Sequence, residues 1–282
     1  MNLPRVVETP YALRDVLAGI RPGLVPTMGA LHQGHLSLIE RSAQENPATV
    51  VSIFVNPTQF QNQGDLSKYP RNLERDALTA TEAGADLIYA PSAQTVYPEG
   101  FTTTVSVAGL TDRWEGISRP GHFTGVATVV SILLNTVQPA RAYFGEKDYQ
   151  QLQVVRRMQR DLQLPGEIVG CPTLRDDDGL ALSSRNSRLS GVERTAAVSL
   201  SQALFAMRDA ANTGERKSAD LLRIGTGIVA AEPLVALDYL AIVDPDSLTP
   251  IDELMPGARA LIAATIGETR LIDNLALWEP ED

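Results

Sequence analysis

The sequence has little of what would cross-link the chain or carry it into a membrane. Cys171 is the one cysteine among 282 residues, so no disulfide can form within the chain. The first residues include no apolar segment of the kind that a signal peptide needs. The most apolar stretch, 125–134, contains Thr128 and Ser131 and is too short to cross a bilayer. We therefore expect a soluble, cytoplasmic protein with no membrane partner.

Positive charge is also scarce. The chain has 24 lysines and arginines against 34 aspartates and glutamates, which gives a net charge of −10. Proteins that bind nucleic acids normally present a basic face, so we expect no nucleic-acid partner. A nucleotide ligand is not excluded, because a few local cations and a helix N-terminus are enough to bind its phosphates. The length and the 44% of hydrophobic residues allow one large or two modest domains.

Strand-like and helix-like segments alternate through residues 1–173. Nearly continuous β-branched and apolar runs such as Thr49–Val55 are typical of buried parallel strands. The alternation predicts an α/β domain, a Rossmann-like doubly wound parallel sheet. The expected strands are Leu24–Thr27, Thr49–Val55, Asp86–Ala90, Thr102–Val107, Ala140–Phe144 and Glu167–Gly170. The main expected helices begin at Pro10, Gly34, Leu73, Phe123 and Tyr149.

The pattern changes near Leu174. A polar segment is followed by two long helical patterns and then by apolar, strand-like runs. Helices followed by strands predict a smaller C-terminal α+β domain over residues 174–282. The expected helices are Ser190–Ala211 and Ser218–Ala230, and the expected strands are Leu237–Val243, Ala258–Ile266 and Thr269–Ala276.

The stretch Val25–Glu40 reads as a strand end, a turn with glycine and the start of a helix. It carries His32 and His35 in a His-x-Gly-His arrangement. If Gly34 opens the helix, His32 lies in the turn before it and His35 lies in its first turn, on one face. Free N–H groups and the positive end of the helix dipole would point the same way, which suits phosphate. Packed or surface histidines are the simpler explanation of the motif taken alone.

Three further segments follow predicted strands or lie on loops, where ligands bind in such folds. Asn56–Phe60 offers the side-chain amides of Asn56 and Gln59. Gly145–Asp148 offers the charge of Lys147, with Gln151 one turn into the next helix. Leu182–Arg185 offers two hydroxyls and a guanidinium.

Each of these segments also has a simpler explanation, such as an ordinary turn, a solvated helix start or a polar loop. In the same way Asp176–Asp178 reads as an exposed acidic turn, and His122 as a cap of the helix that follows it. In this order and on these loops, the segments together favour a nucleotide site.

These segments resemble the pantothenate synthetase (pantoate–β-alanine ligase) family, within the His-x-Gly-His nucleotidyltransferase superfamily. The matching segments span most of residues 20 to 190 in the order of the family. They are Val25–Leu38, Val51–Phe60, Tyr69–Arg71, Arg119–Val126, Phe144–Gln151 and Asp178–Asn186. One departure is Leu182, where the family commonly has methionine, an exchange that conserves volume.

The resemblance implies an enzyme that activates pantoate with ATP to pantoyl adenylate and then transfers the pantoyl group to β-alanine. It implies a first domain that binds nucleotide and pantoate, a second that acts as a lid, and a homodimer. Mg²⁺ would bridge phosphate oxygens with few protein ligands, Asp76 being a weak candidate for a water-mediated contact. The alternative is another His-x-Gly-His nucleotidyltransferase that acts on a different small acceptor.

The resemblance also implies the roles of individual residues. His35, as proton donor, would act with His32, Lys147 and Arg185 in catalysis. Pantoate would be bound by Gln59 and Gln151, with Asn56 and Met28 nearby, and Gln59 would also border the β-alanine pocket. The ATP site would be lined by Met28, Gly29, Ala30, Leu31, His32, Gln33, Gly34, His35, Gly145, Glu146, Lys147, Asp148, Leu174, Leu182, Ser183, Ser184 and Arg185.

Overall fold

The computed structural model describes residues 4–60 and 63–279, and the chain divides into two compact units. The N-terminal unit extends to Glu146 and takes in Gln150–Pro172. The C-terminal unit contains Lys147–Tyr149 and the chain from Thr173 onward. The three residues Lys147–Tyr149 thus belong to the C-terminal unit, although the residues on either side of them belong to the N-terminal one.

A parallel sheet of six strands forms the centre of the N-terminal unit, in the order β1-β4-β3-β2-β5-β6. The order reverses between β2 and β5, the strands at which the two halves of a doubly wound sheet meet and beside which such sheets bind ligands. The Rossmann-like prediction is therefore confirmed. The strands are β1 (Val6–Val7), β2 (Gly23–Thr27), β3 (Thr49–Ile53), β4 (Leu87–Tyr89), β5 (Arg141–Gly145) and β6 (Glu167–Cys171).

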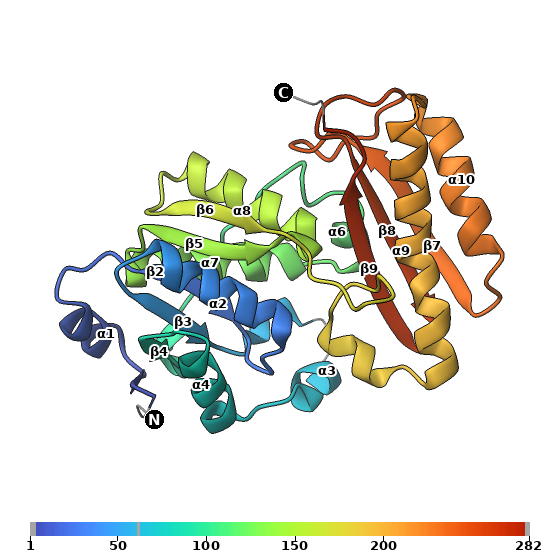
Figure 1. The fold of residues 1–282 in the computed structure, drawn as a ribbon. Coiled ribbons are helices and arrows are strands. Elements are labelled where there is room, and N and C mark those ends of the chain that lie inside the picture. The colour runs from blue at the N-terminus through green and yellow to red at the C-terminus, as the bar shows by residue number, and fades with distance from the viewer. Residues whose placement is uncertain (1–3, 61–62, 280–282) are drawn as a thin grey trace. The chain divides into compact units, whose positions relative to one another are not determined.

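Helices cover both faces of this sheet (Figure 1). On one face α2 and α4 pack their apolar residues against Val25, Val51 and Ile88. The mostly buried α7 packs against the sheet at β2. The longer helices are α1 (Pro10–Leu17), α2 (Gln33–Glu45), α4 (Leu73–Glu82), α7 (His122–Val137) and α8 (Tyr149–Asp161), and the short ones are α3 (Gln63–Lys68), α5 (Ala93–Val96) and α6 (Glu115–Ser118).

One predicted strand is wrong. Residues 102–107 form no strand, and their alternating side chains are exposed or half-buried. The N–H of Val105 donates to the side-chain oxygen of Thr128 on α7, 3.0 Å away, where a strand would donate to a neighbouring strand. Conversely, the two-residue strand β1 and the short helices α3, α5 and α6 were not predicted, because segments this short show no resolvable periodicity.

The C-terminal unit is a three-stranded antiparallel sheet with two long helices packed against it (Figure 1). The strands β7 (Val235–Val243), β8 (Arg259–Ile266) and β9 (Thr269–Ala276) pair in chain order. Helices α9 (Gly191–Asn212) and α10 (Ser218–Ala230) close a core that includes Leu200, Leu204 and Ile262. The predicted α+β class is confirmed for this unit.

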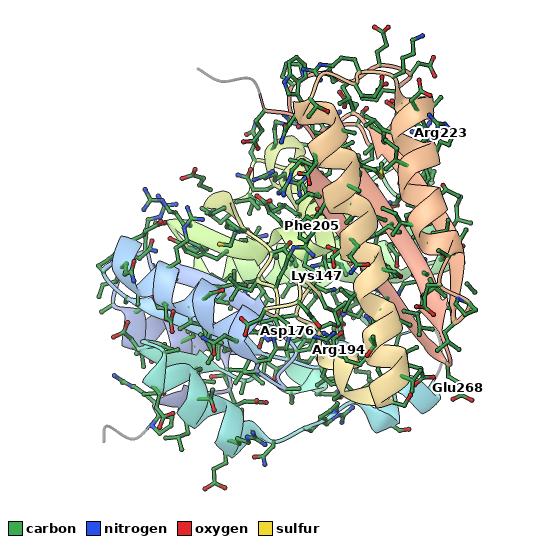
Figure 2. The ribbon with its side chains drawn as sticks, turned by 45° about the vertical axis from the view of Figure 1, so that its right-hand side comes forward. Lys147, Asp176, Arg194, Phe205, Arg223 and Glu268 are labelled. Atoms are coloured by element: carbon green, nitrogen blue, oxygen red, sulfur yellow. The ribbon has the colours of Figure 1, made fainter. Side chains whose placement is uncertain are left out.

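Charged groups fasten the loop before α9 to the rest of the C-terminal unit. Arg194 of α9 lies beside Asp176 (Figure 2). It forms ion pairs with Asp176, at 2.7 Å, and with Asp178, at 2.8 Å. Arg175 makes two hydrogen bonds to the buried carboxylate of Asp273, and its guanidinium lies 5.1 Å from the ring centre of Phe205. The acidic turn Asp176–Asp178 is therefore tied to a neighbouring helix.

Within the described residues, no helix is both long and apolar enough for a membrane span.

Candidate active site

The turn after β2 is built on one buried carboxylate. Gly29 and Ala30 both have left-handed backbone conformations, with φ of 83° and 52°. The N–H groups of Ala30 and Leu31 donate to the two carboxylate oxygens of Asp76, over 2.9 and 3.0 Å. A Cβ atom on Gly29 would lie 2.7 Å from that carboxylate, so only glycine fits. Asp76, 5% exposed in the first turn of α4, thus fixes the turn that leads into the two histidines.

His32 and His35 form a capping box at the N-terminus of α2. Nδ1 of His32 accepts the N–H of Gly34 over 3.2 Å, and Nδ1 of His35 accepts the N–H of His32 over 3.4 Å. A ring nitrogen that accepts carries no proton, so in both neutral rings the proton lies on Nε2. The helix begins at Gln33, one residue earlier than predicted, and both histidines lie at its first turn as expected.

A short 3₁₀ turn, η1 (Pro57–Gln59), orients the side chain of Gln59 after β3. Nδ2 of Asn56 donates to Oε1 of Gln59 over 3.1 Å, and Nε2 of Gln59 donates to the sulfur of Met28 over 2.8 Å. The amide of Gln59 therefore has its carbonyl toward Asn56 and its NH₂ toward Met28. In the N-terminal unit the structure thus brings Met28, Asn56 and Gln59 together.

Two adjacent glutamines at the start of α8 have different surroundings. Gln150 is buried, and its amide accepts the N–H of Glu115 and donates to the carbonyl oxygens of Leu110 and Arg113. It fixes the loop between residues 110 and 115. Gln151 is half-buried on the same helical turn. Of the two, Gln151 has the more accessible side chain for a ligand.

In the C-terminal unit, the main chain of Lys147 is fastened to β9. Nδ2 of Asn274 donates to the carbonyl oxygen of Lys147 over 2.9 Å, and Nη1 of Arg259 donates to Oδ1 of Asn274 over 2.6 Å. The same guanidinium lies 3.8 Å from the ring centre of Tyr149. These contacts all lie within the C-terminal unit. The side chain of Lys147 is 17% exposed and lies 3.8 Å from Asp148.

The loop 173–189 brings two more predicted residues to Lys147. The N–H of Leu182 donates to the carbonyl oxygen of Leu174 over 2.9 Å, which closes the loop as a narrow hairpin. The hairpin leads into a 3₁₀ turn, η3 (Ser184–Arg188), capped by the side chain of Ser183. One pocket of the C-terminal unit is lined by Lys147, Ser183, Arg185, Asn186, Arg270 and Asp273 together with apolar side chains. The basic side chains of Lys147, Arg185 and Arg270, from three separate segments of the chain, thus line one pocket together with the carboxylate of Asp273.

Comparison with known proteins shows the family. The family model described as Pantoate-beta-alanine ligase matches residues 5–276. A pantothenate synthetase of Thermus thermophilus is 54% identical over 275 residues, which are 97% of this chain and 99% of that protein. One of Moorella thermoacetica is 48% identical over 277 residues, which are 96% and 98% of the two chains.

The chain belongs to the pantoate–β-alanine ligase family. A crystal structure of a Thermus thermophilus pantothenate synthetase superposes with a TM-score of 0.93 at 54% identity and covers 97% of this chain and 99% of that one. A Francisella tularensis pantoate–β-alanine ligase, solved with β,γ-ATP and β-alanine, gives a TM-score of 0.79 at 32% identity, covering 96% and 97%. Both units of the chain therefore have the fold of the ligase family.

The residues that the family resemblance implied lie in two groups. In the N-terminal unit, Met28–Leu31 form the turn, His32–His35 the first turn of α2, and Gly145 and Glu146 follow at the end of β5. In the C-terminal unit, Lys147 and Asp148 lie in the 3₁₀ turn η2 (Glu146–Asp148), Leu174 and Leu182 pair across the hairpin, and Ser184 is exposed.

Two contributions were not visible in the sequence. Asp76, expected as a possible metal contact, accepts two main-chain N–H groups. His122, expected to cap α7, does not: Gly121 is the N-cap residue, and Nδ1 of His122 lies 3.1 Å from the main-chain oxygen of Gln59. Both contacts join residues far apart in the chain, so no local pattern could have signalled them. Among the described residues, no group of three acidic, histidine or cysteine side chains could hold a metal.

Proposed function

We propose that the chain condenses pantoate with β-alanine to give pantothenate, with ATP converted to AMP and pyrophosphate. In the first step a carboxylate oxygen of pantoate attacks the α-phosphorus, and the bond to pyrophosphate breaks. In the second step the amine of β-alanine attacks the carbonyl carbon of pantoyl adenylate, and AMP leaves. Similarity over nearly the whole length to pantothenate synthetases supports this reaction.

The observation that carries the proposal is the reciprocal cap of His32 and His35. It holds both Nε2 protons on one turn at the positive end of α2, where phosphate oxygens are favoured. Donors fixed before the reaction stabilise the charge that develops on the α-phosphate and pyrophosphate. We assign His35 as a hydrogen-bond donor to phosphate through its Nε2 proton, with His32 beside it.

Lys147, Ser183, Ser184 and Arg185 are proposed to bind the nucleotide from the C-terminal unit, which would act as a lid. The pocket shared by Lys147, Ser183 and Arg185 supports this role. The Francisella tularensis ligase was solved with an ATP compound and β-alanine, which supports both as substrates here. Mg²⁺ is proposed to enter with ATP, since a cation held by phosphate oxygens needs few protein ligands.

Gln59 and Gln151 are proposed to bind pantoate, with Met28 and Asn56 beside Gln59. The orientation of the Gln59 amide supports this assignment, because its NH₂ group donates to a thioether sulfur, a weak acceptor. An oxygen of the acid would be a better acceptor.

On the resemblance alone, we also propose a cytoplasmic homodimer, and the mass measured by analytical ultracentrifugation would test the dimer.

Formation of AMP tests the proposed function directly. We expect AMP only when ATP, pantoate and β-alanine are all present. Exchange of labelled pyrophosphate into ATP should require pantoate but not β-alanine, because this exchange reports only the first step. Exchange that proceeds without pantoate, or with other small acids equally well, would instead support a nucleotidyltransferase with a different acceptor.

A further inference from the structure

The turn that carries Gln59 is packed directly against the start of α7. A Cβ atom added to Gly125 would lie 2.6 Å from the carbonyl oxygen of Thr58 and 2.8 Å from the main-chain nitrogen of Gln59. No larger residue fits there without moving the turn. The carbonyl oxygen of Gly125 accepts a hydrogen bond from Nδ2 of Asn56 over 3.1 Å. The first turns of α7 therefore form a rigid support behind η1.

The side chain of His122 contacts the main chain of the same turn. The ring is 5% exposed, and Nδ1 lies 3.1 Å from the carbonyl oxygen of Gln59. A carbonyl oxygen only accepts hydrogen bonds, so Nδ1 carries the proton and donates. This is the opposite of His32 and His35, whose Nδ1 atoms accept. The third histidine of the chain thus contacts the residue whose side chain is proposed to meet pantoate.

Asn56 contacts the side chain of Gln59, whereas His122 contacts its main chain. It is 1% exposed, and its NH₂ group donates to the carbonyl oxygen of Gly125 and to Oε1 of Gln59. Its Oδ1 accepts from the hydroxyl of Tyr97 over 2.7 Å. Burial raises the pKa of Tyr97, so the phenol stays protonated and continues to donate. Both ends of the Asn56 amide are used within the protein, and Asn56 acts on a ligand through Gln59.

We propose that His122 is a positioning residue for acid recognition, which fixes the main chain of Gln59 against α7 so that the Gln59 amide presents its NH₂ group to pantoate. The inference rests on the proposed function. An oriented donor needs no reorganisation when the acid binds, and a misplaced one loses part of its binding energy. His122 touches neither pantoate nor ATP in this scheme.

Two substitutions separate the hydrogen bond from the packing of the ring. His122→Phe keeps an aromatic ring but removes the donor. His122→Asn removes the ring but keeps a nitrogen donor two bonds beyond Cβ, where Nδ1 stands in histidine. Ser131→Ala is the matched control, because it removes a buried side-chain hydrogen bond from the same helix, made to Thr128 rather than to the turn.

Pantoate-dependent pyrophosphate exchange provides the readout. For His122→Phe we expect the apparent Michaelis constant for pantoate to rise about tenfold, which is the size of effect that the loss of one hydrogen bond can have. The apparent Michaelis constant for ATP should change less than about twofold. His122→Asn should recover most of the pantoate affinity even if its melting temperature is the lower of the two. Ser131→Ala should leave both constants within about twofold of the wild type.

The outcomes separate this proposal from the proposed function. If the wild type shows no exchange that depends on pantoate, the proposed function fails. If the wild type is active but His122→Phe raises both constants equally, or neither, the positioning role is wrong. Failure of His122→Asn to recover pantoate affinity while folded, as shown by circular dichroism, would also overturn it.

Discussion

His32 and His35 cap the same helical turn reciprocally, with ring centres 4.2 Å apart. Each Nδ1 accepts a main-chain N–H, and this sets both neutral rings to the tautomer with the proton on Nε2. The cap that begins α2 and the chemistry proposed for its histidines thus depend on the same two hydrogen bonds. Replacing either histidine affects both.

His35→Ala should slow adenylation by about 10²–10³. The change removes the Nε2 donor and one half of the cap, so stability should also fall by about 1 kcal/mol. Single-turnover formation of pyrophosphate measures the first effect and thermal unfolding the second. Glu40→Ala, an exposed change on the same helix, is the control. A His35→Ala enzyme that keeps a near-normal single-turnover rate would contradict the role assigned to His35.

Asp76→Asn should loosen the turn before α2. A carboxylate accepts from the N–H groups of both Ala30 and Leu31, whereas an amide offers one oxygen and would oppose one of these donors with its own NH₂ group. We expect stability to fall by about 1–3 kcal/mol and the KM for ATP to rise. Glu74→Gln, an exposed change in the same helical turn, should do neither. An unchanged melting temperature for Asp76→Asn would show that the carboxylate is not needed.

Lys147→Met should slow adenylation by about 10²–10³, because it removes a fixed positive charge from the proposed phosphate site. Asn274 holds the main chain of Lys147, and this contact survives the substitution, so the unit should keep its fold. Lys217→Met removes the same charge from an exposed position in the same unit. Equal single-turnover rates for the two variants would refute a special role for Lys147.

Acid should weaken the attachment of the loop 173–189. Hydrogen bonds from Arg194 lower the pKa of Asp178 in the folded state. Its contribution to stability is therefore complete above the unfolded pKa of about 3.9 and is lost as the pH falls through the lower, folded value. The Asp178 side chain is 48% exposed, so solvent screening limits the contribution of its ion pair with Arg194 to the free energy of unfolding to about 0.2–1 kcal/mol.

Melting curves between pH 7 and pH 2 test this linkage. Arg194→Met should melt about 1–3 °C below the wild type at pH 7, and this gap should narrow below pH 4. The control residue Arg223 lies on α10 (Figure 2), and its side chain is 75% exposed. Arg223→Met removes the same charge and should show no such convergence. A gap between Arg194→Met and the wild type that stays constant down to pH 2 would mean that Asp178 is not the group responsible.

What could be predicted from the sequence depended on how local each feature is. Thr9 and Pro10 begin α1, and apolar periodicity located β3 and α7 to within a few residues. The alternation in residues 102–107 was misleading because a strand also needs a partner strand, and Val105 instead bonds to Thr128. A period of two reports which side chains share a face, and it does not report what that face meets.

The supports of the candidate site were beyond prediction for the same reason. Asp76 contacts a turn more than forty residues earlier, with separations of 45 and 46 positions. Asn274 reaches Lys147 across 127 positions, within the C-terminal unit. Single residues that act through a distant main-chain group leave no periodic pattern. The side chains proposed to bind ligands lie in recognisable motifs, and the side chains that hold them do not.

Gln150 and Gln151 have identical side chains at adjacent positions, yet replacing each of them should have a different effect. Gln150→Ala removes three hydrogen bonds to the loop at residues 110–115 and leaves buried main-chain groups unsatisfied, so it should destabilise the protein by about 1–3 kcal/mol. Gln151→Ala should leave the melting temperature nearly unchanged and mainly raise the KM for pantoate. Steady-state kinetics and thermal unfolding on both variants measure the two effects. If Gln151→Ala lowers the melting temperature as much as Gln150→Ala and leaves the pantoate KM unchanged, Gln151 is structural and its proposed role in pantoate binding is wrong.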